Sequence, residues 1–227
     1  MSSRERIERA VHRVGAPVRT PLALRRHLRG GGTARLNLGC GGALPAGWLN
    51  TDRHPAQGAA HLDVTRRFPL PGGRFGHVLC EHVIEHVTLE QGRAMLRECA
   101  RVLRPGGRVR VSTPDLALVA ALACDGDDPT AARYRDWAAQ AFCAGSVGTP
   151  SALVVNHAFR GWGHRFLYDE ETLARALRDA GFTDIRRHPY RHSADVAFQG
   201  IEGQGIDPVG HEMRGFETLA LEATRSY

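Results

Sequence analysis

The stretch RLNLGCGGALPAGWLNTD, which runs from Arg35 to Asp52, decides the fold of this chain. A short apolar run ends at Leu38, glycines follow at positions 39, 41 and 42, and a second apolar segment ends at the acid Asp52. This order predicts a β-strand, a tight glycine turn and a second β-strand. Many nucleotide-binding α/β domains begin in this way, so the question is which ligand the glycines approach.

The residues after the glycine turn argue against a dinucleotide. A dinucleotide fingerprint opens a long helix whose N-terminus holds the pyrophosphate. Here Pro45 and Gly47 interrupt any long helix. Only ten residues separate Gly41 from Asp52, whereas about 20 are typical of dinucleotide folds. We therefore do not expect a dinucleotide oxidoreductase.

Strand and helix patterns alternate along the rest of the chain. Thr88 and Gln91 form a capping-box sequence before one helix, and Asp169 precedes another. We expect strands at residues 35–38, 47–51, 59–63, 76–80, 108–113, 183–190 and 216–223, and further helices at 116–123 and 129–142. The alternation predicts an α/β fold, a Rossmann-like, doubly wound, mainly parallel seven-stranded sheet with helices on both faces. Ligands of such sheets bind at the carboxyl ends of the strands.

Length and composition predict one domain with additions. The chain has 227 residues, of which 42% are hydrophobic and 24% charged, and its net charge is +6. All of its basic charge comes from arginine, because the sequence contains no lysine. We expect a basic N-terminal arm at residues 1–32 and an α/β domain at 33–227, with a helical lid insertion at 115–165.

Composition also limits the cellular location and the kinds of partner that we expect. The five cysteines are dispersed without a C-x-x-C pair, which favours reduced thiols and a cytoplasmic location. No segment approaches the run of about 20 apolar residues that spans a membrane. The arginines form no long block with interleaved aromatic residues, so a nucleic-acid partner is a secondary alternative. A monomer and a homodimer both remain open.

Several motifs follow the glycine turn in a specific order. HLDVT spans residues 61–65, FGHVLCEHVIEHV spans 75–87 and LRECARVLRPGGRVRVSTPD spans 96–115. Together with LNLGCGG and Asp52, this series resembles the class I S-adenosylmethionine-dependent methyltransferases. It is most similar to a bacterial group of small methyltransferases that often accompany glycan or natural-product genes. The segment RFLYDEETLARALRDAGF at 165–182 supports the resemblance.

The resemblance implies S-adenosylmethionine as the cofactor and S-adenosylhomocysteine as its product. Asp52 would accept hydrogen bonds from both ribose hydroxyls, and Asp63 would accept one from the adenine amino group. Asp63 has a structural alternative, in which it only caps the turn before Thr65. The implied cofactor-binding residues are Asn37, Gly39, Cys40, Gly41, Asp52, Leu62, Asp63, Val64, Glu81 and His82.

The stretch CEHVIEHV permits three interpretations. Methyl transfer to a hydroxyl needs in-line alignment and a proton acceptor, for which histidine is the usual residue near neutral pH. His82 is therefore a candidate base or substrate contact. Alternatively, His82, Glu85 and His86 form a divalent-metal site, for example for Mg²⁺, completed by His157 or His164. In the third interpretation Glu85 and His86 only tie the loop to the sheet.

A second cluster, NHAFRGWGHRFLYDEE at residues 156–171, concentrates polar and aromatic side chains before a helix. Such a composition suits a lid that closes over an acceptor. His157 and His164 are further candidates for the catalytic base, and Arg160, Trp162 and Tyr168 are candidate substrate contacts. The alternative is a well-packed loop with satisfied histidines.

These observations predict an S-adenosylmethionine-dependent methyltransferase that O-methylates a small-molecule acceptor, a sugar or a natural product. Asn-Pro-Pro-Tyr and Asp-Pro-Pro-Tyr motifs are absent after the fourth strand, which disfavours N-methylation of adenine or glutamine. Two alternatives remain: an RNA or protein methyltransferase, and a catalytically silent scaffold that binds the cofactor.

Overall fold

The computed structural model describes residues 24, 27, 33–124, 128–143, 148 and 150–227. Apart from Leu24 and His27, the predicted basic arm at 1–32 lies outside the described residues. None of the helices within the described ranges has the length and apolar character needed to cross a membrane.

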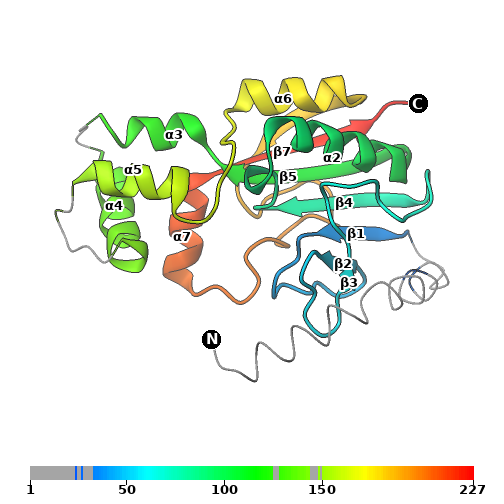
Figure 1. Ribbon diagram of the computed structural model, residues 1–227, viewed down its shortest axis with the longest axis horizontal. Helices are drawn as coiled ribbons and strands as arrows, with labels where there is room; N and C mark the ends of the chain where they lie inside the picture. The colour runs from blue at the N-terminus through cyan, green and yellow to red at the C-terminus, as the bar shows by residue number, and fades with distance from the viewer. Residues whose placement is uncertain (1–23, 25–26, 28–32, 125–127, 144–147, 149) are drawn as a thin grey trace.

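The centre of the molecule is the predicted seven-stranded, mainly parallel sheet (Figure 1). Its strands follow the order β3-β2-β1-β4-β5-β7-β6. Strands β1 to β5 pair in parallel, and β7 is antiparallel to both β5 and β6. The bounds are β1 Arg35–Leu38, β2 Leu49–Asp52, β3 Ala60–His61, β4 Phe75–Glu81, β5 Leu103–Pro114, β6 Phe182–His188 and β7 Thr218–Arg225. The Rossmann-like fold class is thereby confirmed.

Local capping signals place several helices where the sequence predicts them. Thr88 and Gln91 form the capping box of α2, and Asp169 caps α6 through the Thr172 N–H. Two helices, α5 and α7, were not expected, and the last strand begins after Phe216 because α7 ends at Glu217. The bounds are η1 Ile84–His86, α2 Leu89–Val102, α3 Leu116–Ala121, α4 Pro129–Phe142, α5 Ser151–Arg160, α6 Glu170–Asp179 and α7 Pro208–Glu217.

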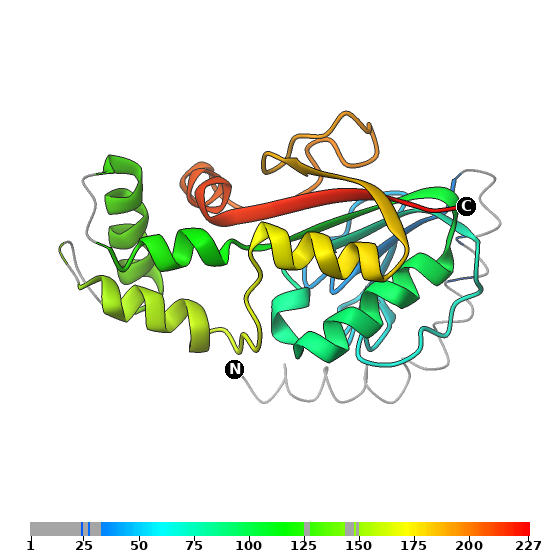
Figure 2. The same cartoon turned by 90° about the horizontal axis from the view of Figure 1, so that it is seen from above.

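The two faces of the sheet are covered differently (Figure 2). Helices α2 and α6 cover one face, where they form the main core with alternate residues of β4 such as Val78 and Cys80. The intervening residue Leu79 points to the other face and packs with Trp48 and Phe198. Phe198 belongs to the long connection 189–207 between β6 and α7. In the described ranges this connection, rather than a helix, covers the centre of the second face.

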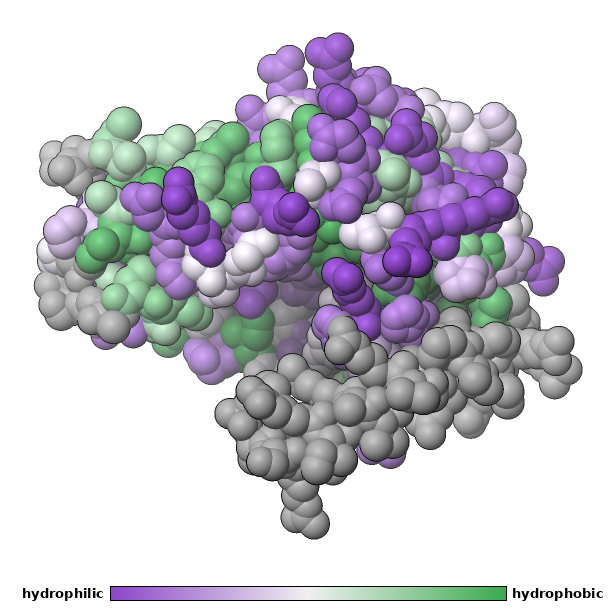
Figure 3. Space-filling view, viewed as in Figure 1, coloured by the Kyte–Doolittle hydropathy of each residue, from purple (hydrophilic) through white to green (hydrophobic). Residues whose placement is uncertain are grey.

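Helices α3, α4 and α5 gather beyond the carboxyl end of β5, at one end of the molecule (Figure 1). They have a small core of their own, separate from the main core, to which Tyr134 and Val154 contribute. Figure 3 shows that apolar surface gathers over this end, whereas hydrophilic surface covers the end with α2 and α6. Exposed apolar side chains there include Phe142, Leu153, Phe159 and Trp162. The lid insertion predicted at 115–165 stays a prediction.

Candidate functional site

An open cavity of about 370 Å³ lies at the carboxyl ends of β1 and β4. This volume falls within the range of small-molecule sites. Strand ends, the glycine turn and the segment 203–214 supply its walls. The lining residues are Asn37, Gly39, Cys40, Gly42, Ala43, Glu81, His82, Gly203, Gln204, Ile206 and Arg214. The structure therefore brings the predicted residues Asn37, Gly39, Cys40, Glu81 and His82 to one cavity.

The glycine turn needs glycine at Gly39 for two reasons. Its φ of +60° lies in the left-handed region that L-residues rarely adopt. A Cβ atom added there would lie 2.3 Å from Cγ2 of Val83. The backbone of the turn thus approaches the segment that follows β4 more closely than a residue with a side chain would allow.

Asp52 ties the glycine turn to the end of β2. Its Oδ2 accepts a hydrogen bond from the Gly41 N–H at 3.0 Å, and its Oδ1 accepts one from the His54 N–H at 2.6 Å. A carboxylate oxygen can accept two hydrogen bonds. Each oxygen therefore keeps the capacity to accept one from a ligand hydroxyl.

Asn37 and Cys40 contribute structure to the cavity wall. Asn37 is buried, and its Nδ2 donates to Asn50 Oδ1 at 3.1 Å and to the Ala43 carbonyl at 3.4 Å. These contacts hold the chain that follows the turn. Burial raises the pKa of the Cys40 thiol to about 11, so this thiol is protonated near neutral pH.

The segment after β3 shows the structural alternative for Asp63. Its Oδ1 accepts hydrogen bonds from the Thr65 N–H at 2.9 Å and from Thr65 Oγ1 at 2.6 Å. Its Oδ2 lies 3.7 Å from the Nε atoms of Arg53 and Arg66. Burial opposes ionisation, but the Thr65 hydrogen bonds and the two arginines outweigh it and lower the pKa of Asp63. Leu62 is buried in the main core, and Val64 packs against that core.

Glu81 closes the cavity at the end of β4. Its Oε1 accepts a hydrogen bond from the Gly203 N–H at 2.8 Å. Burial is the largest influence on this carboxyl group and raises its pKa, against the opposing effects of His82 and the Gly203 N–H. Arg214, from α7, lines the same cavity and supplies a positive charge.

His82 stands between the cavity and a buried carboxylate. Its Nδ1 lies 3.2 Å from Glu85 Oε1, and its Nε2 lies 3.4 Å from Thr218 Oγ1 on β7. Its φ is +49°, an uncommon value for a residue with a side chain. Burial disfavours the charged ring, but Glu85, with Glu217 nearby, outweighs burial and raises the pKa of His82.

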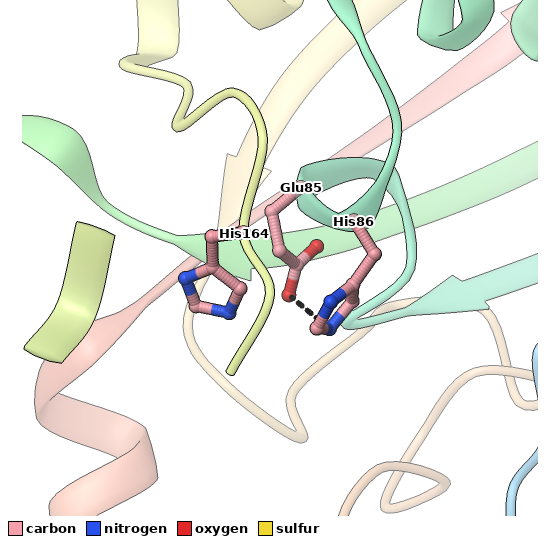
Figure 4. Close-up of side chains that lie close together, drawn as sticks. All are labelled: Glu85, His86 and His164. Atoms are coloured by element: carbon pink, nitrogen blue, oxygen red, sulfur yellow. Dashed lines mark ion pairs between the residues drawn. The ribbon is translucent and has the colours of Figure 1, made fainter. Parts of the chain in front are cut away.

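Glu85 also lies beside two other histidines (Figure 4). One ligand atom each of Glu85, His86 and His164 lies within 4.8 Å of the others. The predicted metal set differs from this group, because it included His82 and left the choice between His157 and His164 open. Of the two histidines left open, His164 is the one that lies beside Glu85. The Arg165 N–H donates to the Glu85 carbonyl at 2.7 Å and so holds the segment around His164 against η1.

Comparison with known proteins finds a family match for the first part of the sheet. Residues 36–111, which include β1, β2, β4 and most of β5, match the family model for a methyltransferase domain. Together with the fold, this match supports an S-adenosylmethionine-dependent methyltransferase of class I. No curated protein matches it.

Solved structures of methyltransferases are similar to this methyltransferase at low identity. A SAM-dependent methyltransferase from Archaeoglobus fulgidus shares 14% identity at a TM-score of 0.48, covering 90% of this chain and 92% of that one. A SAM-dependent methyltransferase from Thermotoga maritima shares 17% identity at a TM-score of 0.48, covering 96% of this chain and 99% of that one. Phosphoethanolamine N-methyltransferase 2 from Haemonchus contortus shares 13% identity at a TM-score of 0.45, covering 91% of this chain and 52% of that one.

Three residues of the predicted lid lie together, but outside the walls of the methyltransferase cavity. His157 packs between Phe142 and Trp162, with ring centroids 5.9 and 4.4 Å away. Arg160 is exposed at the end of α5. This arrangement matches the alternative of a packed aromatic segment, and it gives His157 no direct place at the cavity.

Tyr168 lies apart from the other predicted substrate contacts, because it is wholly buried in the main core. A Cβ atom added at Gly92 of α2 would lie 2.5 Å from its Oη. Gly92 therefore makes room for the phenol, and burial raises the pKa of Tyr168 to about 12. Tyr168 thus lies in the core and not among the cavity-lining residues, and its role in substrate binding stays a prediction.

Sequence reasoning missed the cavity wall formed by Gly203, Gln204, Ile206 and Arg214. One local signal was present: Asp207 followed by Pro208 is a common helix start, and Asp207 does cap α7 through the Gly210 N–H. That signal predicts the helix. It does not predict that the helix returns to the end of β4.

Proposed function

We propose that this methyltransferase transfers the methyl group of S-adenosylmethionine to a hydroxyl oxygen of a small molecule, with His82 as the base. The observation that carries the proposal is the position of His82, which lines the cavity while its Nδ1 lies 3.2 Å from the buried Glu85 carboxylate. A sugar or a natural product is the acceptor that we propose.

The cofactor would lie along the glycine turn. Asp52 keeps one free acceptor site on each carboxylate oxygen, which suits the two hydroxyls of a ribose. The guanidinium of Arg214 suits the carboxylate of the methionine moiety. The adenine would extend toward Leu62, Asp63 and Val64, where Asp63 still has an oxygen that accepts no hydrogen bond from within the described ranges.

His82 would act in its neutral form. It would take the proton of the acceptor hydroxyl as the oxygen attacks the sulfonium methyl in line. The raised pKa of His82 makes the ring a stronger base, and Glu85 stabilises the imidazolium that forms. His164 and His157, the other predicted bases, lie outside the cavity walls, so His82 is the better placed of the three.

The acceptor would enter from the end formed by α3, α4 and α5, where apolar side chains are exposed. A sugar or natural product with an apolar part would match this surface. All five cysteines are free, which fits the cytoplasm as the location we propose.

The test is a methyl-transfer screen with S-adenosylmethionine labelled in its methyl group. The acceptors are hydroxylated sugars and natural products, total RNA and a protein extract, each with the wild-type chain and with His82→Gln. We expect label on a small hydroxylated molecule, lost with His82→Gln. Label on RNA or protein alone would replace the proposed acceptor class, and full activity of His82→Gln would remove His82 as the base.

A further inference from the structure

We infer that Glu85, His86 and His164 form a binding site for a divalent transition-metal cation of the Zn²⁺, Co²⁺ or Mn²⁺ type. Figure 4 shows the three side chains converging from η1 and from the segment before Tyr168. Their ligand atoms lie within 4.8 Å of one another. One carboxylate with two imidazoles suits these cations better than Mg²⁺, which prefers oxygen ligands.

Glu85 presents an unsatisfied oxygen toward the two rings. The residue is wholly buried, and its Oε2 accepts a hydrogen bond from Thr113 Oγ1 at 3.1 Å. Its Oε1 accepts no well-aligned hydrogen bond from the described residues. His82 Nδ1 lies 3.2 Å from this oxygen, which has a second lone pair for a cation. A bound cation would compensate the burial of the carboxylate.

His164 is held in the tautomer that a metal ligand needs. Its Nδ1 lies 2.5 Å from the Ala158 carbonyl, and since a carbonyl only accepts, Nδ1 carries the proton. The lone pair is then on Nε2, which Figure 4 shows on the side of the ring that faces Glu85. Metal-bound histidines typically donate their other N–H to a carbonyl or carboxylate in this way.

Backbone hydrogen bonds fix the positions of Glu85 and His164 relative to each other. The Glu85 carbonyl accepts hydrogen bonds from the N–H groups of Arg165 and Phe166 at 2.7 and 3.2 Å. His164 is therefore fixed next to Glu85, although 79 positions separate the two in the sequence. This contact makes the site a property of the fold rather than of two mobile side chains.

His86 completes the set from the solvent side. Its side chain is 40% exposed, its Nε2 lies 4.0 Å from Glu85 Oε1, and its ring centroid lies 4.9 Å from that of His164. Ligand atoms on one Zn²⁺ lie about 3.4 Å apart, so a small rotation of the exposed ring would close the site. Three protein ligands leave further positions for water or an acceptor oxygen. Because metal binding is measurable without an acceptor, this inference fails or stands independently of the proposed function.

The experiment is a titration of the full, tag-free chain with Co²⁺, followed by visible absorption and by calorimetry, with Mg²⁺ in parallel. We expect saturation at one equivalent of Co²⁺ without an intense thiolate band, and much weaker binding of Mg²⁺. His164→Gln and His86→Gln should each weaken Co²⁺ binding at least tenfold. The matched control is His192→Gln, an exposed histidine of the 189–207 connection, which should bind Co²⁺ like the wild type.

Two measurements keep the outcome unambiguous. Circular dichroism and S-adenosylhomocysteine affinity show whether each variant is folded. If folded wild-type protein does not saturate with millimolar Co²⁺, the inference is overturned. Equal Co²⁺ affinity in His164→Gln, His86→Gln and His192→Gln would also overturn it, because the cation would then bind elsewhere.

Discussion

Gly203 donates its backbone N–H to Glu81 Oε1 at 2.8 Å, although the two residues are 122 positions apart. The contact joins the connection 189–207 to the end of β4 and so completes the cavity. Gly203 has a φ of +70°, and a Cβ atom there would lie 2.0 Å from Tyr190 Oη. The wall of the methyltransferase site therefore depends on how this connection is anchored to the sheet.

Arg110 is the anchor, and Arg110→Ala should destabilise the protein strongly. This wholly buried arginine pairs with the buried carboxylates of Glu202 and Glu222 and donates to the carbonyls of Pro189 and His192. The substitution leaves the buried Glu202 carboxylate without an arginine, whereas Glu222 keeps its ion pair with Arg108 at 2.6 Å. Breaking a buried ion pair costs about 3–5 kcal/mol. Urea unfolding measures the loss.

The matched control for Arg110 is Arg133→Ala. Arg133 pairs with Glu212 on the surface, where both side chains are exposed. That change should cost less than about 1 kcal/mol. Equal losses of unfolding free energy in the two variants would contradict the anchoring role of Arg110.

Asp52→Ala should weaken S-adenosylhomocysteine binding about 10- to 100-fold, since hydrogen bonds to a charged group are worth about 1.5–3 kcal/mol each. Calorimetric titration measures the affinity. Thermal unfolding checks the fold, because Asp52 also accepts hydrogen bonds from Gly41 and His54. Asp179→Ala, an exposed change at the end of α6, is the control. Unchanged affinity in Asp52→Ala would remove the proposed ribose contact.

Gly39→Ala and Gly42→Ala should differ sharply, although they are three residues apart. The left-handed φ of Gly39 costs about 1–2 kcal/mol for alanine, and the new Cβ would also collide with Val83. A Cβ at Gly42 meets no atom within 4 Å. We expect a lower melting temperature and weaker S-adenosylhomocysteine binding only for Gly39→Ala. Equal behaviour of both variants would show that the turn tolerates side chains.

His82→Gln should lower kcat about 10²- to 10⁴-fold, the usual contribution of a general base. The affinity for S-adenosylhomocysteine should change much less, because the ring acts on the acceptor. His157→Gln is the matched control and should keep kcat near the wild-type value. Steady-state kinetics with the acceptor found in the screen measure both variants, and an equal effect of both would reject His82 as the base.

The His82–Glu85 pair should make stability depend on pH with a defined sign. Burial opposes both charges, but Glu85 raises the pKa of His82, and His82 lowers the pKa of Glu85. The histidine contribution is complete below the unfolded pKa of about 6.5 and is lost as pH rises through the higher folded pKa. The glutamate contribution is complete above about pH 4.3 and is lost as pH falls through the lower folded pKa.

The pair therefore stabilises the fold most between about pH 4.3 and 6.5. The loss of unfolding free energy in His82→Gln should be larger at pH 6 than at pH 9. Urea unfolding at both values measures it, with His192→Gln as the control. A loss that is equal at the two pH values would show that the pair is not charged in the folded state.

Local patterns predicted most of the sheet and one half of the cavity. Strand β1, helix α4 and the capping box of α2 appear where the sequence places them, because turn residues and caps act over a few positions. Helix α5 was missed since no side chain caps its N-terminus and its preceding segment is rich in glycine, serine and proline. Without a local signal, the formation of α5 depends on tertiary packing, which the sequence pattern does not record.

The other half of the cavity depends on contacts that no local pattern records. Gly203 and Arg214 reach the site because Arg110 binds Glu202 from a distant strand. The buried position of Tyr168 depends on a distant contact of the same kind. An aromatic residue before a helix is compatible with a lid. In the structure, however, the missing side chain at Gly92 of α2 makes room for the Tyr168 ring in the core.

Among the described residues, the sheet and the end formed by α4 and α5 pack in separate hydrophobic cores, and this division has a consequence for how the methyltransferase can diversify. Residues of α4 and α5 such as Tyr134 and Val154 pack in the small core, whereas the strands that carry the proposed cofactor residues pack in the large one. Mutations in the small core are therefore free to reshape the acceptor end while the platform under the cofactor keeps its stability. Related proteins can therefore keep the same sheet and still differ in the acceptor that they bind.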